Sequence, residues 1–182
     1  MQFADIIGQK ETKQQLAELV QHNRLSHALL FLGKEGSGSL SLAIAFAQYV
    51  VCEKVNGGKS GVGSQESGPS LFGEPESSNV EPPTLNDSCG VCPACQKAQQ
   101  LIHPDIHFSY PTVTKKPGEK PVATDFITDW REFVKLSPYG NSYDWIEQIK
   151  EKENSQGKIT AEECNDIIRK LSLKSFESVY KI

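Results

Sequence analysis

Residues 28–51 read ALLFLGKEGSGSLSLAIAFAQYVV, and this stretch decides the fold that we expect. A short apolar run, a glycine-rich bend and an Ala/Leu-rich run follow one another, in the order of a strand, a loop and a helix. In such a unit, backbone N–H groups at the start of the helix can bind phosphate. The continuous apolar run at 28–32 predicts a strand covered on both faces, as in a parallel sheet, so an α/β fold class is expected.

The glycine-rich bend keeps the spacing of a phosphate loop but lacks its working side chains. The motif is G-x-x-x-x-G-K-[ST]. Counted from Gly33, the second glycine is in place at Gly38. Ser39 replaces the lysine that neutralises phosphate charge, and Leu40 replaces the hydroxyl that binds Mg²⁺. Two required electrostatic parts are missing, so hydrolysis and catalytic residues are not expected here.

Two interpretations of this bend remain open. In the first, it forms only a tight turn and the nucleotide site is vestigial; in the second, the helix N-terminus retains weak binding of a nucleotide or another anion. Lys34 lies five residues before the lysine position, so we expect its side chain to point to solvent. ATP is therefore not an expected cofactor. The residues of this candidate site are Gly33, Gly36, Gly38 and Ser39.

Length and charge exclude several classes of protein. A chain of 182 residues suits one domain, with appended pieces, and can bury a core. Its 19 Lys and Arg against 23 Asp and Glu give a net charge of −4, which argues against a protein that mainly grips a phosphate backbone. No apolar stretch is long enough to span a membrane, and no export signal is visible at the N-terminus. We therefore expect a soluble cytoplasmic protein whose partners are proteins.

Two stretches have the composition of insertions. Residues 53–88 are dominated by Gly, Ser, Pro, Asn and Glu and offer few side chains for burial, so a flexible insertion is expected. Residues 111–158 begin with a basic loop that contains Pro and Gly, and then show two amphipathic patterns. These patterns predict helices over about 123–136 and 143–152.

The remaining stretches predict a second strand and further helices. Residues 106–111 alternate apolar and polar side chains and predict the strand. A helix is expected over about 10–22. A capping box at 160–163 starts another, in which Cys164 falls on the apolar side and is expected in the core. The apolar residues at 179–182 suggest an N-terminal fragment that is cut at the start of a third strand.

The cysteine pattern indicates a metal site. Five cysteines, an odd number, do not suit a disulfide framework. Three of them, Cys89, Cys92 and Cys95, are close enough in the chain to hold one tetrahedral ion. Cys52, at the end of the preceding helix, can supply the fourth ligand if the long insertion loops out. Four thiolates form a closed structural zinc site, so zinc is the expected cofactor.

The alternatives to a four-cysteine zinc site are few. Free thiols without a metal remain one of them. An iron–sulfur cluster would need a further cysteine shortly after Cys95, and residue 99 is Gln. His103 and His107 are reserve ligands in case Cys52 points elsewhere. A catalytic zinc ion would keep an open position for water, and nothing in the sequence suggests one.

Several of these stretches together resemble a known family. Residues 3–9 read FADIIGQ, residues 25–33 read LSHALLFLG, and His103 begins the triplet His-Pro-Asp. With the four cysteines, they resemble the bacterial clamp-loader ATPase family of the DNA polymerase III holoenzyme, which includes the gamma/tau and delta-prime subunits. The resemblance covers residues 1–110 and resumes at about 159–182.

The resemblance implies an AAA+ module of the α/β class, a P-loop-type parallel sheet flanked by helices. It also implies a small zinc module inserted after the phosphate-loop helix, formed by residues 89–102 and completed by Cys52. On this match residues 1–182 are a partial N-terminal module that ends before the Walker B strand. The resemblance places four residues at the zinc-ligand positions: Cys52, Cys89, Cys92 and Cys95.

The resemblance also implies a function. Gamma/tau subunits have an intact lysine and threonine in the loop, whereas Ser39 and Leu40 are similar to the delta-prime subunit, the non-hydrolysing stator of the loader. The implied role is in DNA replication, helping to load the sliding clamp onto primed DNA as part of the DNA-directed DNA polymerase III complex. The implied partners are the gamma/tau and delta subunits, and indirectly the clamp and primed DNA, with no membrane. The family's arginine finger, lid and collar would lie beyond residue 182.

Two rival functions remain open from the sequence. One is an ATP-hydrolysing, gamma/tau-like subunit with a variant phosphate loop that uses Lys34 or another lysine. The other is a zinc-dependent nucleic-acid-binding module with contacts from the basic loop, at Lys115, Lys116 and Lys120. The acidic balance of the chain makes solvated lysines the simpler interpretation.

Overall fold

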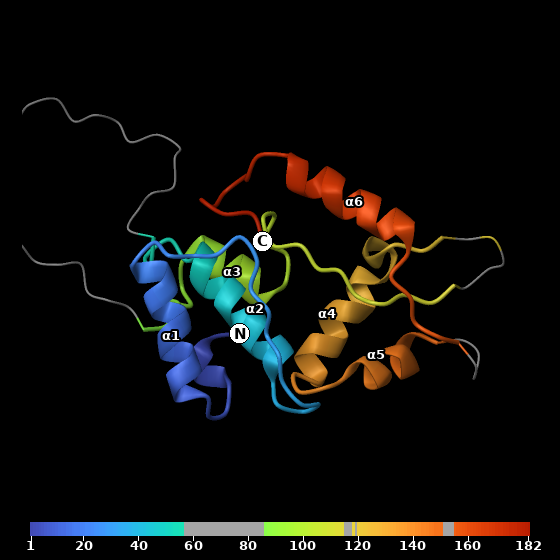
Figure 1. Cartoon of the computed structure of the whole chain (residues 1–182), viewed down its shortest axis with the longest axis horizontal. Helices are drawn as coiled ribbons and strands as arrows, with labels where there is room; N and C mark the ends of the chain where they lie inside the picture. Colours follow the sequence, from blue (N-terminus) through green and yellow to red (C-terminus); the bar gives the residue numbers. More distant parts are fainter. Residues whose placement is uncertain (57–85, 115–117, 119, 151–154) are drawn as a thin grey trace, which may run out of the picture.

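The computed structural model describes residues 1–56, 86–114, 118, 120–150 and 155–182, so most of the flexible insertion expected at 53–88 lies outside the described residues. Helices joined by irregular segments make up this part of the chain (Figure 1). None of these helices combines the length and the apolar character needed to cross a membrane. In order, the elements are η1 (Phe3–Asp5), α1 (Lys10–Gln21), α2 (Ser39–Val51), α3 (Pro93–Gln99), η2 (Ala123–Phe126), α4 (Ile127–Leu136), α5 (Ser142–Ile149) and α6 (Ala161–Ser172).

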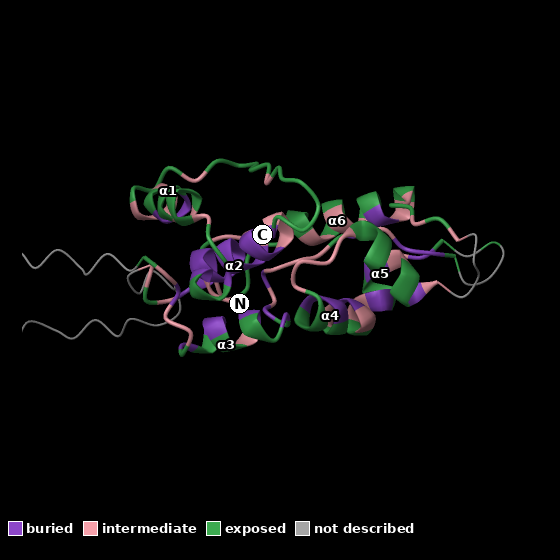
Figure 2. Cartoon of the chain, turned by 90° about the horizontal axis from the view of Figure 1, so that it is seen from below, coloured by how far each residue is buried: buried purple, intermediate pink, exposed green. Residues whose placement is uncertain are grey.

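The predicted parallel sheet, and with it the α/β fold class, is wrong for the described residues, which contain no β-strand. Residues 28–32, expected as the first strand, lie in an exposed connection between α1 and α2 (Figures 1 and 2), where Leu30 and Leu32 are 86% and 87% exposed. A strand is stabilised by hydrogen bonds to a neighbouring strand and by cover on its faces. Within the described ranges no segment pairs with the backbone of 28–32, so an apolar run alone does not make it a strand.

The second expected strand, at 106–111, is irregular as well. Ile182 donates a backbone hydrogen bond to the carbonyl of Asp105, and His107 donates one to the carbonyl of Ile182, both at 2.8 Å. Further along, an isolated antiparallel bridge joins Thr112 to Lys158. Each of these pairings involves one or two residues on a side, which is too short to form a sheet.

Helix α2 lies between α1 and α3 (Figure 2). Its sequence is apolar on nearly every side, and most of its residues are buried, as is typical of a core helix. The buried side chain of Gln48 is satisfied, because it donates to Ser88 Oγ at 3.0 Å and accepts from the amino group of Met1 at 2.9 Å. Helices α1 and α3 and the short η1 all pack on α2.

The helices α4 and α5 form where the sequence predicts two helices, and an aromatic cluster joins them to the rest of the chain. Tyr110 stacks on Trp130 with 4.2 Å between ring centroids, and Trp145 meets both rings edge-on at 5.1 Å. The Tyr110 hydroxyl donates to the carbonyl of Ala123, and Trp145 Nε1 donates to the carbonyl of Pro111, both at 2.7 Å. The same cluster reaches one face of α2.

Helix α6 begins at its predicted capping box, where Thr160 Oγ1 accepts a hydrogen bond from the backbone N–H of Glu163 at 3.2 Å. Its predicted core face, however, is wrong: Cys164 is exposed, and Leu171 is 51% exposed. The helix is held by a polar contact instead. The buried carboxylate of Glu163 accepts a hydrogen bond from the backbone N–H of Ala123 at 2.6 Å.

Candidate functional site

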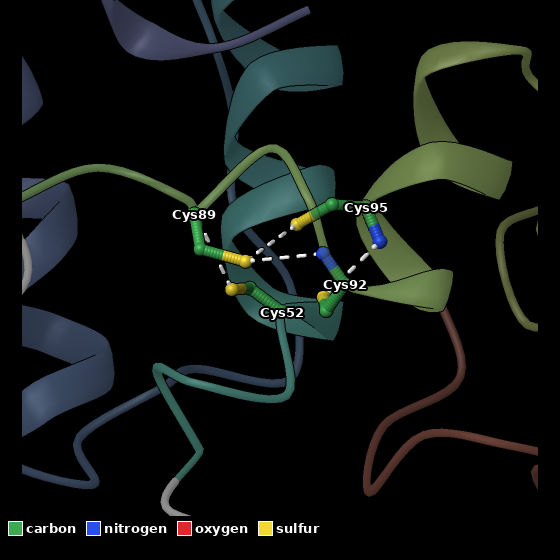
Figure 3. Close-up of side chains that lie close together, drawn as sticks. All are labelled: Cys52, Cys89, Cys92 and Cys95. Atoms are coloured by element: carbon green, nitrogen blue, oxygen red, sulfur yellow. Dashed lines mark hydrogen bonds between the residues drawn. The ribbon is translucent and has the colours of Figure 1, made fainter.

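Four cysteine side chains lie together at the C-terminal end of α2 (Figure 3). Cys52 is the residue that ends α2, and Cys89 lies ahead of α3. Cys92 is the N-cap of α3, and Cys95 lies in its first turn. The four sulfur atoms are all within 4.8 Å of one another, and three of the four residues are buried. The structure thus brings together the four residues that the sequence predicts as a ligand set.

The backbone near the cysteines owes its shape to a glycine and a proline. Gly90 has a φ of +70°, and a Cβ at this position would lie 2.9 Å from Oε1 of Gln2. Only glycine suits both the left-handed backbone and the close neighbour. Pro93 occupies the first position of α3, where its missing N–H is no loss. The chain therefore turns sharply between Cys89 and Cys92 and starts α3 directly after them.

Backbone N–H groups point at the sulfur atoms and favour their anionic form. The N–H of Cys89 donates to Cys52 Sγ at 3.4 Å, and the N–H of Cys92 donates to Cys89 Sγ at 3.4 Å. Hydrogen bonding with Cys95 lowers the pKa of the Cys52 thiol to about 4, and the same contact raises the pKa of Cys95. Burial raises the pKa of Cys92. These contacts thus favour the thiolate form of Cys52, which is the form that binds metal.

The spacing of the sulfur atoms fits a metal ion. The Sγ atoms of Cys89 and Cys95 lie 3.9 Å apart. Sulfur ligands around a tetrahedral zinc ion, each at about 2.3 Å from the metal, are roughly 3.8 Å from one another. Apolar side chains of α3, including Ala94 and Ala98, enclose the group. The four cysteines can therefore hold a metal ion, with protein ligands at all four positions.

The reserve ligands lie outside this group of four. His103 Nδ1 accepts a hydrogen bond from the backbone N–H of Asp105 at 3.2 Å. Burial lowers the pKa of both His103 and His107 and so favours their neutral imidazole forms. The fifth cysteine, Cys164, is exposed on α6.

At the opposite end of α2, the glycine-rich bend forms one wall of a cavity of about 330 Å³. Gly36 and Gly38 have φ values of +74° and +78°, which let the chain turn tightly into α2. A Cβ at Gly33 would lie 2.3 Å from Ser37 Oγ, so the bend is folded onto its own serine. The predicted site residues that line the cavity are Gly33, Gly36, Gly38 and Ser39.

The other residues that the sequence singled out have different surroundings. Leu40, at the position of the motif's hydroxyl, packs against the aromatic cluster of α4 and α5. Lys34 is exposed at the rim of the cavity. Lys120 forms an ion pair with Glu162. Lys115 and Lys116 of the basic loop lie outside the described residues.

The second wall of the cavity comes from the second insertion, which the sequence does not link to the bend. Its residues include Tyr139 and Gly140 of the turn between α4 and α5, together with Trp130 and Trp145. The stretch Ser-Pro-Tyr-Gly-Asn at 137–141 signals a turn. No local pattern shows that this turn meets a bend about a hundred residues earlier in the chain.

Comparison with known proteins gives one family match and one significant relative. The sequence profile of the family described as "DNA polymerase III, delta subunit" matches residues 8–68. The DNA polymerase III subunit tau/gamma of Haemophilus influenzae is 44% identical over 50 residues. That alignment covers 28% of this chain and 7% of the relative, so the chain spans a small part of the relative's length. No solved structure shows significant similarity to the chain.

Both matches name subunits of DNA polymerase III, one a delta subunit and the other tau/gamma. The family profile covers the glycine-rich bend and α2, and both matches agree with the resemblance drawn from the sequence. That resemblance is therefore confirmed at the level of the family. Over the matched residues the chain is similar to subunits of DNA polymerase III, in agreement with the resemblance to the clamp-loader family.

Proposed function

We propose that this chain acts in DNA replication as a non-hydrolysing, stator-like subunit of the DNA polymerase III clamp loader. The phosphate loop carries the proposal, because its glycine turn is kept while Ser39 and Leu40 stand at the lysine and hydroxyl positions. Without these two groups the chain offers neither a cation for the β- and γ-phosphates nor a protein ligand for Mg²⁺. The packing of Leu40 against the aromatic cluster supports a structural role for this position.

In this role the chain contributes a rigid frame, and hydrolysis takes place on neighbouring subunits. Membership of the family supports partnership with other clamp-loader subunits, and we assign the gamma/tau and delta subunits as these partners. The sliding clamp and primed DNA are engaged only through the assembled loader. A net charge of −4 supports this indirect contact with DNA, because direct binding relies on an excess of cations.

Zinc is the ion that we assign to the four cysteines. The donor set is all sulfur, the ligands close all four positions, and the spacing of the sulfur atoms suits a tetrahedral ion. Such an ion supplies no reaction of its own, because no position is left for water or substrate. Its effect is structural: Cys52, Cys89, Cys92 and Cys95 would tie the end of α2 to α3.

Incubation of the purified chain with Mg²⁺ and radiolabelled ATP tests the proposal. We expect no release of phosphate above the protein-free blank. The variant Lys34→Ala is the matched control, because Lys34 is the lysine within the phosphate loop itself. If the wild-type chain hydrolyses ATP and Lys34→Ala abolishes this activity, the proposed function is wrong. The chain would then be an ATP-hydrolysing subunit with a variant loop.

A further inference from the structure

The turn between α4 and α5 lies against the N-terminal end of α2. The hydroxyl of Ser41, in the first turn of α2, donates a hydrogen bond to the carbonyl of Pro138, and the two residues are 97 positions apart in the chain. Ser41 is buried, so the donor side of this contact is shielded from water. Figure 1 shows the connection from α4 to α5 next to the segment that leads into α2.

Tyr139 extends from this turn onto the phosphate loop. A Cβ at Gly38 would lie 2.6 Å from Cε1 of Tyr139, so the ring rests directly on the residue that caps α2. The hydroxyl of Tyr139 accepts a hydrogen bond from the backbone N–H of Ile7 at 2.9 Å. The ring is thus held at both ends, by the loop and by the N-terminal segment. A phosphate bound by the first N–H groups of α2 would lie beside the same cap residue.

The turn that presents Tyr139 is itself well anchored. A Cβ at Gly140 would lie 2.7 Å from Cζ of Phe133, so the turn sits close on α4. Asn141 caps α5, because its Oδ1 accepts from the backbone N–H of Asp144 at 3.0 Å while Asp144 accepts from the N–H of Asn141 at 3.0 Å. With both flanks fixed in this way, little freedom is left for the ring to swing away.

We infer that Tyr139 seals the phosphate loop at its cap residue: the second insertion holds residues 33–39 in their folded turn, and the ring on Gly38 restricts the approach of phosphate groups to the start of α2. The inference rests on the proposed non-hydrolysing function and deepens it. Ser39 and Leu40 lack the groups that phosphoryl transfer needs, whereas Tyr139 covers the cap residue Gly38 on the side of the cavity. The inference also assigns a role to the second insertion, which would cover the phosphate loop within the same chain.

Amide hydrogen exchange without any nucleotide tests the seal directly. In Tyr139→Ala we expect residues 33–40 to exchange at least about tenfold faster than in the wild-type chain, because local opening becomes easier. Tyr139→Phe keeps the ring but loses the hydroxyl, so the loop stays protected while the amide of Ile7 exchanges faster. Tyr143→Ala, which truncates a tyrosine that is 68% exposed on α5, is the matched control and leaves the loop unchanged.

Unchanged loop exchange in a folded Tyr139→Ala chain would overturn the seal. If that variant does not fold, Tyr139→Phe decides the question, and an unaltered Ile7 amide then overturns the proposed contact. Because these samples contain no nucleotide, the result does not depend on whether the chain hydrolyses ATP. The seal and the proposed function can therefore fail separately.

A second experiment measures access for phosphate groups. The double variant Ser39→Lys/Leu40→Thr restores the motif's lysine and hydroxyl, yet with Tyr139 in place we expect it to bind Mg-ATP weakly. Adding Tyr139→Ala should tighten binding by at least about tenfold, since an opened loop can accept phosphate at the start of α2. Equal affinity of the double and triple variants in isothermal titration calorimetry would overturn the seal.

Discussion

The carboxylate of Asp105 accepts a hydrogen bond from the backbone N–H of Ser178 at 2.8 Å, although the two residues are 73 positions apart in the chain. Two neighbouring N–H groups, those of Phe176 and Glu177, donate to the same carboxylate at 2.6 and 2.7 Å. Asp105 is fully buried. A single side chain therefore holds the segment after α6 against the segment after α3.

We expect Asp105→Asn to lower the free energy of unfolding by about 2–4 kcal/mol, because an amide oxygen accepts weaker hydrogen bonds and the new NH₂ group faces other donors. Urea denaturation followed by circular dichroism measures this difference. Glu132→Gln removes an exposed carboxylate on α4 and serves as the control, with an expected change within about 0.5 kcal/mol. Equal effects of the two substitutions would count against the proposed contribution of Asp105.

The ionisation of Asp105 makes its contribution depend on pH. Burial opposes its charge, but the three backbone donors and the nearby His103 outweigh burial, so the pKa of Asp105 lies below its ordinary value of 3.8. A carboxyl with a lower pKa in the folded chain than in the unfolded chain stabilises the fold above the ordinary pKa, and this stabilisation is lost as the pH falls through the folded value.

The stability difference between the wild-type chain and Asp105→Asn should accordingly be constant from about pH 7 to pH 5 and shrink below about pH 4. Urea denaturation of both proteins at a series of pH values checks this. The comparison between the two proteins removes the common effect of other titrating groups. A difference that persists undiminished at pH 2 would show that the charge of Asp105 is not the stabilising feature.

Removal of the metal should destabilise the chain. We expect the purified protein to contain about one equivalent of zinc, and Cys95→Ser to contain much less, because a closed site depends on all four ligands. A loss of about 2 kcal/mol or more would lower the melting temperature by roughly 4–8 °C for a chain of this size. Elemental analysis and thermal denaturation, with and without a chelator, give both quantities.

The control for the metal experiment is Cys164→Ser, which changes the exposed cysteine outside the group of four. It should leave both the zinc content and the melting temperature as they are. A metal-free wild-type protein with a melting temperature that does not respond to a chelator would instead favour the free-thiol interpretation.

The contact between Gly38 and Tyr139 can be measured as a coupling energy. Gly36→Ala and Gly38→Ala both place a side chain at a positive φ, which costs about 1 kcal/mol. A Cβ at Gly36 has no neighbour within 4 Å, whereas one at Gly38 meets the Tyr139 ring. Gly38→Ala should therefore destabilise the chain by about 1–3 kcal/mol more than Gly36→Ala.

Combining Gly38→Ala with Tyr139→Ala should recover part of this extra cost, because the collision is gone and only the backbone strain remains. The double-mutant cycle, evaluated from urea denaturation, should give a coupling of about 1–2 kcal/mol. The same cycle with Gly36→Ala should give none. Strict additivity at Gly38 would mean that the ring moves aside freely.

Features set by neighbours in sequence could be predicted from the residues alone. The periodic apolar residues of α1, α4 and α5 and the capping box before α6 are local signals, and each helix forms where its signal lies. The clustering of the four cysteines was predictable for a similar reason. Three of its cysteines lie within seven residues, and the fourth ends the preceding helix.

Features that need a distant partner could not be predicted in this way. The run at 28–32 is apolar enough for a buried strand, but a strand forms only beside another strand, and the described residues supply none. The apolar stripe of α6 suggested a core position for Cys164, yet the contact that fixes this helix is polar and comes from Glu163. The meeting of Tyr139 with Gly38 likewise has no local signature.

Helix α2 has the glycine-rich bend before its first residue and Cys52 after its last. Its 13 residues make a rod roughly 20 Å long, packed on several sides and therefore stiff. If one end of such a stiff helix is fixed, the other end cannot shift along the helix axis. Binding of an ion at the four cysteines would thus fix the position of the glycine-rich bend along the axis of α2. Removal of the ion should therefore make this bend more mobile, although none of the four cysteines contacts it.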